Sequence, residues 1–284
     1  MIDDVSDIVE MYDRDSVDED RRLMRHQLER DITWRYLKDY LPPQGSILEI
    51  GAGTGRYTLE LAKRGYAVTA VDFSSKLVEK CRIRMADEGL TEKVRLVVAD
   101  ARNLGEVATE GFDAVLLTGP LYHLVEKEDR ETAISEAHRR LKPGGIVFST
   151  FITRLGILGD VLKHQSQWIE NQAEVRSIIE HGRNPENPRK GEFRGYFACM
   201  SEVSPLHESL GFETLVVAGV EPAISADDES YNRLEGKQRK LWLDLLYEVS
   251  SEKSTIGSSR HILYIGKKTE EQVNANNRVQ RTSL

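Results

Sequence analysis

Apolar runs alternate with helix-like segments from residue 46 to residue 152, and this alternation constrains the fold more than any other feature. The runs are rich in Val, Ile and Leu, and they predict strands at 46–53, 67–72, 94–100, 112–119 and 146–152. Segments with helical spacing separate most of them, at 57–65, 74–89 and 129–145. Apolar strands joined by helices are typical of parallel sheets with right-handed crossovers. We therefore predict a doubly wound, mostly parallel α/β sheet with helices on both faces.

The second half of the chain completes this sheet after a long interruption. Two further apolar runs predict strands at 212–223 and 261–268, which brings the expected total to seven strands. Helices are predicted at 157–182, 202–211 and 232–250. The stretch between the fifth and sixth strands, about 153–211, is too long for an ordinary connection. We interpret it as a helical lid insertion that walls a substrate site.

Charge and composition exclude several classes of function. The 39 basic and 47 acidic residues give a net charge of -8, and acidic side chains crowd the first 20 positions, which disfavours a nucleic-acid partner. The chain has no apolar run near the roughly 18 residues of a membrane span, and its acidic start differs from a secretory signal. We therefore expect a cytoplasmic protein without a membrane partner. Cys81 and Cys199 lack the spacing of a zinc site, no metal is expected, and Cys81 is interpreted as a core residue.

A glycine-rich turn follows the first predicted strand, in the segment Glu49-Ile-Gly51-Ala-Gly53-Thr-Gly55. Glycine lets the backbone turn sharply and approach a ligand closely, and the following helix points free N–H groups toward anions. Asp72 ends the next strand, 21 residues after Gly51, where a carboxylate can accept hydrogen bonds from both hydroxyls of a ribose. Together, the turn and the carboxylate predict a cofactor that contains adenosine.

The details of these motifs separate the candidate cofactors. A dinucleotide fingerprint would have glycine or alanine at position 56, where this chain has Arg56. Asp100 ends the third strand and could meet an adenine amino group. The ordered set LEIGAGTG, VDFS, VADAR, FDAVLLTGPLYHL and LKPGG resembles the class I S-adenosylmethionine-dependent methyltransferases of the small-molecule type, most strongly over residues 40–152. The resemblance implies a Rossmann-like methyltransferase fold and S-adenosyl-L-methionine as cofactor.

The resemblance also implies roles for individual residues. The expected cofactor-binding residues are Glu49, Gly51, Ala52, Gly53, Gly55, Asp72, Phe73, Asp100, Ala101 and Thr118. The glycines would line the methionine part, and Glu49 would lie near its ammonium or order the glycine loop. Asp72 would hold the ribose, Phe73 would lie against the adenine, Asp100 and Ala101 would meet the adenine edge, and Thr118 would lie under the sulfonium. Two alternatives remain open, namely that Gly55 serves helix packing and that Asp72 caps the helix after it.

The candidate catalytic residues, His123 and Tyr122, follow the fourth strand. Neutral imidazole is a competent base near pH 7, so His123 could take a proton from the methyl acceptor, or it could cap the following helix instead. Tyr122 could orient the acceptor or form an aromatic wall. Tyr12 and Arg25 resemble positions that fold over the cofactor, although a solvated helix face is the plainer interpretation of Arg25. The insertion adds candidate pocket residues, namely Trp168, Arg194, Tyr196 and Phe197.

These observations predict an enzyme that methylates an N, O or C atom of a small molecule. The alternatives are a module that binds the cofactor without catalysis and a protein or tRNA methyltransferase, while an NAD-dependent oxidoreductase is disfavoured by Arg56. We expect residues 1–41 to be an N-terminal helical segment over the cofactor site. Residues 42–268 would form the methyltransferase domain with its insertion, and 269–284 a disordered tail.

Overall fold

The structure of the chain is a computed structural model that describes residues 4–107, 111–183, 195–224 and 227–269. Within these ranges, eight strands form one sheet, in the order β3-β2-β1-β4-β5-β8-β7, with β6 paired to β5. The strands are β1 (Ser46–Ile50), β2 (Ala67–Asp72), β3 (Val94–Val98), β4 (Phe112–Leu117), β5 (Leu141–Thr153), β6 (Phe197–Ala198), β7 (Phe212–Gly219) and β8 (His261–Lys268). Among the strands described, β8 pairs antiparallel with both β5 and β7, and all other pairings are parallel. The predicted doubly wound, mostly parallel sheet is confirmed, and the two-residue strand β6 is an addition to it.

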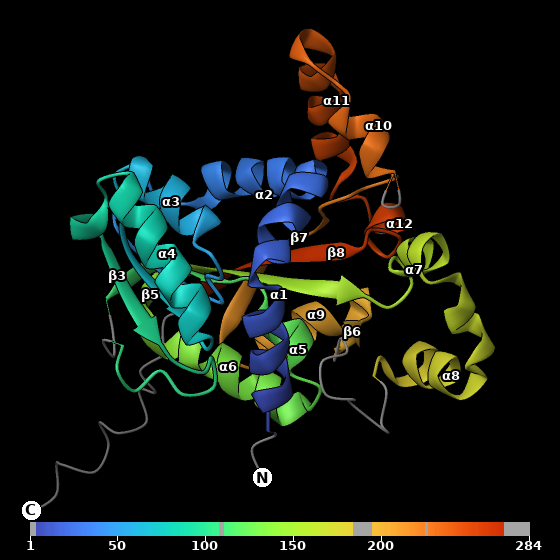
Figure 1. The fold of residues 1–284 in the computed structure, drawn as a ribbon, viewed down its shortest axis with the longest axis horizontal. Helices are drawn as coiled ribbons and strands as arrows, with labels where there is room; N and C mark the ends of the chain where they lie inside the picture. Colours follow the sequence, from blue (N-terminus) through green and yellow to red (C-terminus); the bar gives the residue numbers. More distant parts are fainter. Residues whose placement is uncertain (1–3, 108–110, 184–194, 225–226, 270–284) are drawn as a thin grey trace, which may run out of the picture.

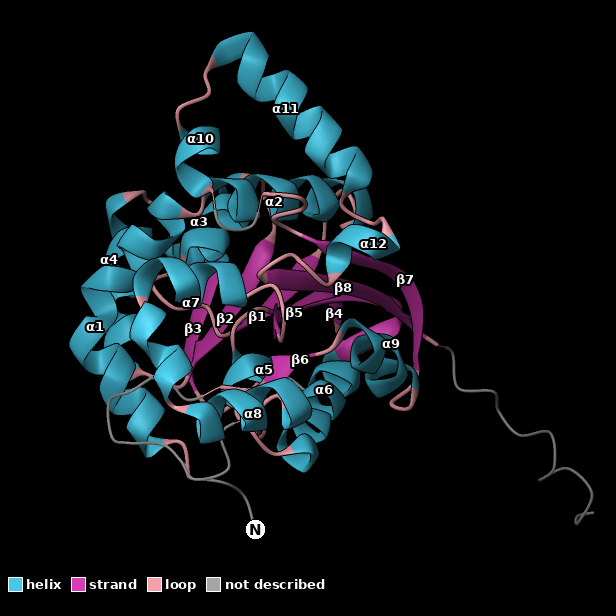
Figure 2. Ribbon diagram, turned by 90° about the vertical axis from the view of Figure 1, so that its right-hand side faces the viewer, coloured by secondary structure: helices cyan, strands magenta, loops and turns pink. Residues whose placement is uncertain are grey.

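Helices cover both faces of the sheet (Figures 1 and 2). They are α1 (Ser6–Arg25), α2 (Gln27–Tyr40), α3 (Arg56–Lys63), α4 (Ser75–Asp87), α5 (Pro120–His123), α6 (Lys127–Arg140), α7 (Leu158–His164), α8 (Gln172–His181), α9 (Met200–Glu208), α10 (Asp228–Asn232), α11 (Gly236–Val249) and α12 (Lys253–Ile256), with short 3-10 turns η1 (Thr91–Lys93) and η2 (Ser166–Glu170). Among the described residues, no helix combines the length and apolar character that crossing a membrane requires.

The core divides into an apolar cluster on each face of the sheet. On one face, Leu121 of α5, Ile134 of α6 and Val203 of α9 pack against the strands. On the other face, Ile32 of α2 and Leu61 of α3 do the same. All five side chains are buried, and burying a side chain of this size contributes roughly 1.5–3 kcal/mol. The strands are apolar on both sides because helices cover both faces of the sheet.

Three predicted helices are interrupted, and these predictions were wrong in extent. The helical segment expected at the N-terminus is divided into α1 and α2 at His26, whose backbone has φ -96° and ψ 62°. The segment 157–182 forms α7, η2 and α8, and the segment 232–250 forms only the end of α10 followed by α11. At His26 the physical reason is tertiary, because the imidazole Nδ1 lies 3.0 Å from the Asp228 carboxylate. Such a contact overrides helical propensity, which is a weak preference.

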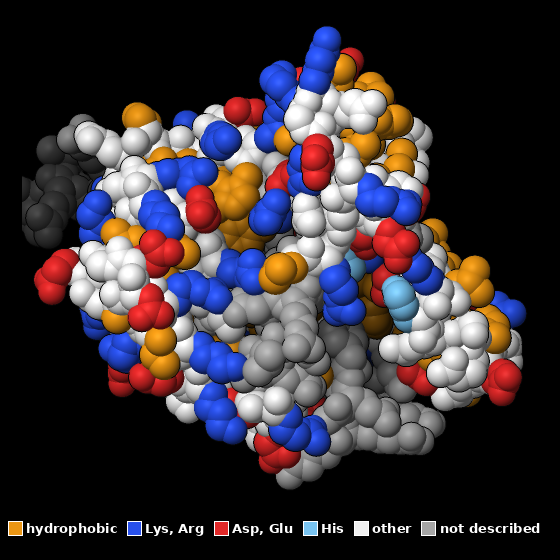
Figure 3. Space-filling model, turned by 45° about the horizontal axis from the view of Figure 1, so that its top comes forward, with side chains coloured by type: hydrophobic (Ala, Val, Ile, Leu, Met, Phe, Trp, Pro, Cys, Tyr) orange, Lys and Arg blue, Asp and Glu red, His pale blue; other side chains and the backbone are white. Residues whose placement is uncertain are grey.

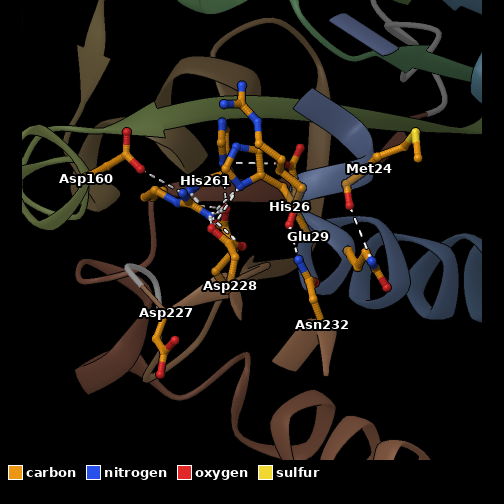
Figure 4. Close-up of polar contacts among 12 residues, drawn as sticks. Met24, His26, Glu29, Asp160, Asp227, Asp228, Asn232 and His261 are labelled. Atoms are coloured by element: carbon orange, nitrogen blue, oxygen red, sulfur yellow. Dashed lines mark hydrogen bonds and ion pairs between the residues drawn. The ribbon is translucent and has the colours of Figure 1, made fainter. Parts of the chain in front are cut away.

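A buried ionic network ties the α1–α2 corner, α7 and α10 to the start of β8 (Figure 4). The buried guanidinium of Arg260 donates to Asp160 at 3.0 Å, to Asp228 at 2.9 Å and to Glu221 at 3.1 Å. Burial by itself would raise the pKa of Glu221, but His261 and Arg260 together lower it to about 2. Glu221 is therefore charged at neutral pH, and this network fixes the insertion and the N-terminal helices on the sheet.

Another buried polar group, His207 of α9, makes the fold sensitive to acid. Its Nδ1 lies 2.8 Å from the carbonyl oxygen of Val203 and therefore carries a hydrogen, while Nε2 accepts from Ser149 at 3.0 Å in the neutral ring. The imidazole also stacks on Tyr264 with ring centroids 3.8 Å apart. Burial lowers the pKa of His207 to about 4 from an ordinary value of 6.5. The unfolded chain then binds this proton more readily than the folded chain does.

We expect His207 to cost the fold stability as the pH falls from about 6.5 to about 4. Above pH 6.5 the imidazole is neutral in both states and His207 costs no stability. At about pH 4 the free energy of unfolding should be lower by on the order of 3 kcal/mol. Urea unfolding across this range measures it. In a His207→Gln variant the dependence should flatten, whereas His164→Gln, at an exposed histidine, should keep the original slope. An equally steep dependence in His207→Gln would contradict the assignment.

Candidate functional site

A cavity lies at the carboxyl ends of β1, β2 and β4, where the strand order reverses between β1 and β4. In doubly wound sheets, ligands bind at such a switch point. The empty space of the cavity, including its open mouth, is about 650 Å³. It is lined by Val5, Ile8, Tyr12, Ile50, Gly51, Gly53, Asp72, Phe73, Leu77, Ala99, Asp100, Ala101, Gly119, Pro120, His123 and Leu124. Its place in the fold and its lining make it the candidate site.

The glycine-rich turn forms one wall of the cavity. Gly51 has φ +83° and its N–H donates to the carbonyl of Val71 at 2.8 Å, while a Cβ at this position would meet the Pro120 ring at 2.5 Å. Gly53 has φ +55°, and a Cβ there would have no atom within 4 Å. Since Gly53 lines the cavity, a ligand can approach its backbone closely. The two glycines thus serve the turn and the approach of a ligand.

Asp72 joins the glycine turn to the end of β2. Its Oδ2 accepts from the Gly53 N–H at 2.8 Å and its Oδ1 accepts from the Ser74 N–H at 2.9 Å, and the residue is 4% exposed. Ser74, in turn, caps α4 by accepting from the Leu77 N–H at 3.1 Å. The carboxylate therefore braces both adjacent loops at the wall of the cavity.

Asp100, which follows the neighbouring strand β3 and also lines the cavity, is held by an arginine. The Arg102 guanidinium donates to Asp100 Oδ2 at 2.6 Å, and the Arg102 N–H donates to Oδ1 at 2.8 Å. The same guanidinium bonds the buried Asp129 of α6 at 2.8 Å. Because Arg102 itself is buried, this chain of charges fixes the direction of the Asp100 carboxylate.

Replacing Arg102 by methionine is expected to weaken the binding of an adenosine ligand about tenfold, because Asp100 loses its charged partner. Titration calorimetry with S-adenosylhomocysteine measures this. The variant should also unfold at a lower temperature, because Asp129 loses its buried partner. Arg102→Lys keeps the charge and should restore part of the affinity. Arg95→Met, at an exposed position of β3, is the control, and a ligand affinity equal to that of the control would contradict this role.

His123 ends α5 at the cavity, beneath α1. Its Nε2 lies 2.7 Å from the Tyr12 hydroxyl, and the two rings meet edge to face at 5.3 Å. The Tyr12 ring also contacts Phe73 at 6.0 Å, while Asp13 accepts from the Ser74 hydroxyl at 2.6 Å. Helix α1 is thus attached to both sides of the cavity and closes it from above. His123 is 6% exposed, so water has little access to its ring.

Several residues expected at the site stand behind the cavity wall. Glu49, Ala52, Gly55, Thr118 and Tyr122 do not line it. Glu49 is 1% exposed and accepts from the Thr58 hydroxyl of α3 at 2.5 Å, which fits its expected role in ordering the loop. Burial raises the pKa of Glu49 to about 8, against the opposing effect of the Thr58 bond. At Gly55, a Cβ would meet the Cys81 sulfur at 2.3 Å, so the packing alternative holds for this glycine.

The insertion contributes less to the cavity than the sequence indicates. Trp168, Tyr196 and Phe197 lie outside its lining, and Arg194 falls outside the described residues. The Tyr196 ring instead packs against the Arg130 guanidinium, and its hydroxyl donates to Glu202. Arg25 is exposed, as its plainer interpretation predicts.

Sequence reasoning missed the apolar part of the wall. Val5, just before α1, Ile8 of α1, Leu77 of α4 and Leu124 complete the cavity. An apolar side chain is recognised from the sequence as core or surface, and nothing in its local pattern separates a cavity wall from a core face. The signal that could have identified Val5 and Ile8 is their spacing with Tyr12 on one helical face.

Glu29, Glu221 and His261 form a group of metal-ligand type outside the cavity, with ligand atoms within 4.8 Å of one another. The Glu221 carboxylate already accepts from Arg260, from His261 Nδ1 at 3.0 Å and from the His261 N–H at 2.9 Å. Since Arg260 supplies the positive charge that a cation would bring, the group fits a structural ion network better than a metal site.

Comparison with known proteins places the cavity in a family. A family model described as a methyltransferase domain matches residues 47–145. The chain is 30% identical over 141 residues to the ubiquinone/menaquinone biosynthesis C-methyltransferase of Geotalea daltonii, covering 47% of this chain and 58% of that protein. It is 32% identical over 142 residues to an uncharacterized methyltransferase of Mycobacterium tuberculosis, covering 49% of this chain and 67% of the relative. The chain thus spans 58 to 67% of the length of these relatives.

Solved structures agree on the fold. A methyltransferase of Methanosarcina mazei dependent on S-adenosylmethionine superposes with a TM-score of 0.56 at 20% identity, covering 83% of this chain and 98% of the other. The 1,6-didemethyltoxoflavin-N1-methyltransferase of Burkholderia thailandensis, solved with its substrate and S-adenosylhomocysteine, gives a TM-score of 0.56 at 15% identity, covering 93% and 88%. Together with the sequence relatives, these comparisons show that the chain belongs to the class I S-adenosylmethionine-dependent methyltransferases.

Proposed function

We propose that this chain transfers a methyl group from S-adenosylmethionine to an N, O or C atom of a small molecule. The observation that carries the proposal is the cavity, in which Gly51, Gly53, Asp72, Asp100 and His123 line one space. Polar residues at the ends of neighbouring strands and apolar residues of α1 thus line the same cavity, as is typical of small-molecule sites.

The residues of the cavity fit this cofactor. The space beside Gly53 that a Cβ would fill can take the methionine part, against a turn whose φ angles only glycine adopts readily. Asp72 offers lone pairs to a ribose diol, and Asp100 offers them to an adenine amino group. Phe73 and Leu77 supply apolar surface between these two carboxylates. Ala52 and Thr118 do not line the cavity. They would support cofactor binding by shaping the backbone of the glycine-rich turn and of the end of β4.

The chain itself has to orient the acceptor, exclude water and accept a proton. When bound, S-adenosylmethionine supplies an activated methyl group. Ile8 and Tyr12 of α1 close the cavity together with Val5, which precedes the helix. Holding the reactants in line can contribute up to roughly 7–11 kcal/mol. His123 would take the proton of an amine or hydroxyl acceptor at an imidazole nitrogen. Tyr122 precedes His123 in α5 and would help to orient the acceptor by positioning this short helix.

The acceptor is proposed to be a small molecule with an apolar body. The side chains of Val5, Ile8 and Leu124 make that part of the cavity apolar. Relatives named for ubiquinone and menaquinone biosynthesis, which include a C-methyltransferase and an O-methyltransferase, support this class of acceptor without fixing the atom. The net charge of -8 favours a small molecule over a nucleic acid.

Binding and turnover together test the proposal. Calorimetry is expected to give heat with S-adenosylhomocysteine and none with NAD, and a response to NAD alone would overturn the cofactor assignment. Purified chain should then move labelled methyl groups from S-adenosylmethionine into one member of a panel of quinols, phenols, amines, acids and thiols. Tight cofactor binding without methyl transfer to any of them would instead support a binding module. The Asp72→Asn variant serves as the control that lacks cofactor binding.

A further inference from the structure

A groove distinct from the cofactor cavity lies between α2, α3 and α4. It is lined by Arg30, Trp34, Arg56, Tyr57, Leu59, Glu60, Arg64 and Arg84, and it encloses about 960 Å³ including its open mouth. None of these residues lines the cofactor cavity. Figure 3 shows this face, where hydrophobic side chains form the floor of a hollow beside α2 and α3, edged by Lys and Arg side chains.

The charge of the groove is opposite to that of the chain. Four arginines face one glutamate in the lining, in a protein whose net charge is -8. Arg30 and Arg64 each have a carboxylate partner, but the lining as a whole, with four arginines and one glutamate, keeps a positive balance that favours an anion. Arginine is suited to such a site because its planar fork matches the oxygens of phosphate.

The arginines are positioned rather than loose. Arg30 bonds Asp31 at 2.9 Å, and Arg64 bonds Glu60 at 2.7 Å with its guanidinium 4.4 Å from the Trp34 ring centre. Arg84 donates to the Thr54 carbonyl oxygen at 2.7 Å and to the Thr54 hydroxyl at 3.0 Å. Arg30 uses Nε and one terminal nitrogen in these contacts, and Arg64 uses one terminal nitrogen, so both guanidinium groups have further N–H donors for a ligand.

The floor of the groove is aromatic. Trp34 and Tyr57 lie with ring centroids 5.4 Å apart and an interplanar angle of 39°. Aromatic rings and arginine planes stack on flat heterocycles, and base stacking of this kind contributes to binding without reading sequence. Neither inorganic phosphate nor an aliphatic anion could stack on these two rings, whereas a ligand with a planar heterocycle could.

We infer that the groove binds a nucleoside phosphate, with its planar base against Trp34 and Tyr57 and its phosphates among the four arginines. The site goes beyond the proposed methyl transfer and uses none of the residues assigned to it. It does reach the cofactor turn, because Arg84 bonds Thr54, which lies between Gly53 and Gly55. A ligand bound by Arg84 would therefore be linked, through Thr54, to the glycine-rich turn that lines the cofactor cavity.

Calorimetric titration of the full chain with ADP tests this inference. S-adenosylhomocysteine is kept saturating throughout, so that the adenosine of ADP cannot enter the cofactor cavity. We expect saturable binding that weakens from about 50 to about 300 mM salt, and binding of adenosine and of inorganic phosphate that is weaker than that of ADP. Arg30→Gln and Arg64→Gln should each weaken ADP binding about tenfold.

The matched control is Arg82→Gln, which removes an exposed arginine of α4 paired only with its helical neighbour Glu79 among the contacts recorded. It should bind ADP like the unchanged chain, and melting temperatures should show that all three variants are folded. Equal ADP affinity in Arg30→Gln, Arg64→Gln and Arg82→Gln would overturn the inference, as would an absence of ADP binding at millimolar concentration. Much tighter binding of a short single-stranded RNA, lost in the same two variants, would replace the nucleotide by a nucleic acid.

Discussion

Replacing Asp72 by asparagine is expected to weaken the binding of S-adenosylhomocysteine roughly a thousandfold. The proposed ribose contact consists of two hydrogen bonds to a charged acceptor, and each such bond contributes about 1.5–3 kcal/mol. Their loss is compounded by the glycine turn, because Asp72 Oδ2 accepts from the Gly53 N–H at 2.8 Å and an amide is a weaker acceptor there. Titration calorimetry at fixed salt measures the affinity.

A matched control separates the ribose contact from a general loss of charge. Asp87 is an exposed carboxylate at the far end of α4, so Asp87→Asn removes the same charge away from the cavity and should leave the affinity unchanged. The melting temperature of the Asp72→Asn variant should fall only modestly, since the amide oxygen can still accept from one backbone N–H. Unchanged cofactor affinity in a folded Asp72→Asn chain would remove the central contact from the proposed site.

Strand ends are the part of the site that sequence reasoning locates best. Gly51, Gly53, Asp72, Asp100 and His123 were expected from their positions after apolar runs, and all five line one cavity. The physical reason is that parallel strands end at the same edge of the sheet, so the local signal of each strand also fixes the meeting of its last residues with those of its neighbours. Phe73 and Ala101, which come directly after Asp72 and Asp100 in the sequence, also line the cavity.

Contacts between distant segments are the part that local patterns do not contain. The break at His26 depends on Asp228, about two hundred residues away, and the closure of the cavity depends on Tyr12 reaching His123. Gly55 illustrates the same limit on a smaller scale, because a glycine that approaches Cys81 and a glycine that approaches a ligand have the same sequence pattern. Side-chain placement decides between them, and it is set by packing rather than by spacing.

The proposed base gives the largest expected effect on turnover. His123→Gln is expected to lower kcat roughly a hundred- to ten-thousandfold at saturating acceptor, which is the usual contribution of a general base. Glutamine keeps a polar side chain of similar reach but does not accept a proton near neutral pH. The affinity for S-adenosylhomocysteine should change little, because the proposed cofactor contacts come from Asp72, Asp100 and the glycine turn. A fall in kcat without a fall in cofactor affinity is therefore the signature of proton transfer.

Tyr12→Phe is the control that separates the base from its partner. It removes the hydroxyl that lies 2.7 Å from His123 Nε2 but keeps the ring that covers the cavity, so the imidazole stays available to the acceptor. We expect kcat to fall by less in Tyr12→Phe than in His123→Gln, because the first variant keeps the imidazole. If instead His123→Gln leaves kcat unchanged while Tyr12→Phe lowers it, the histidine serves to hold α1 over the cavity, and the proton leaves the acceptor by another route.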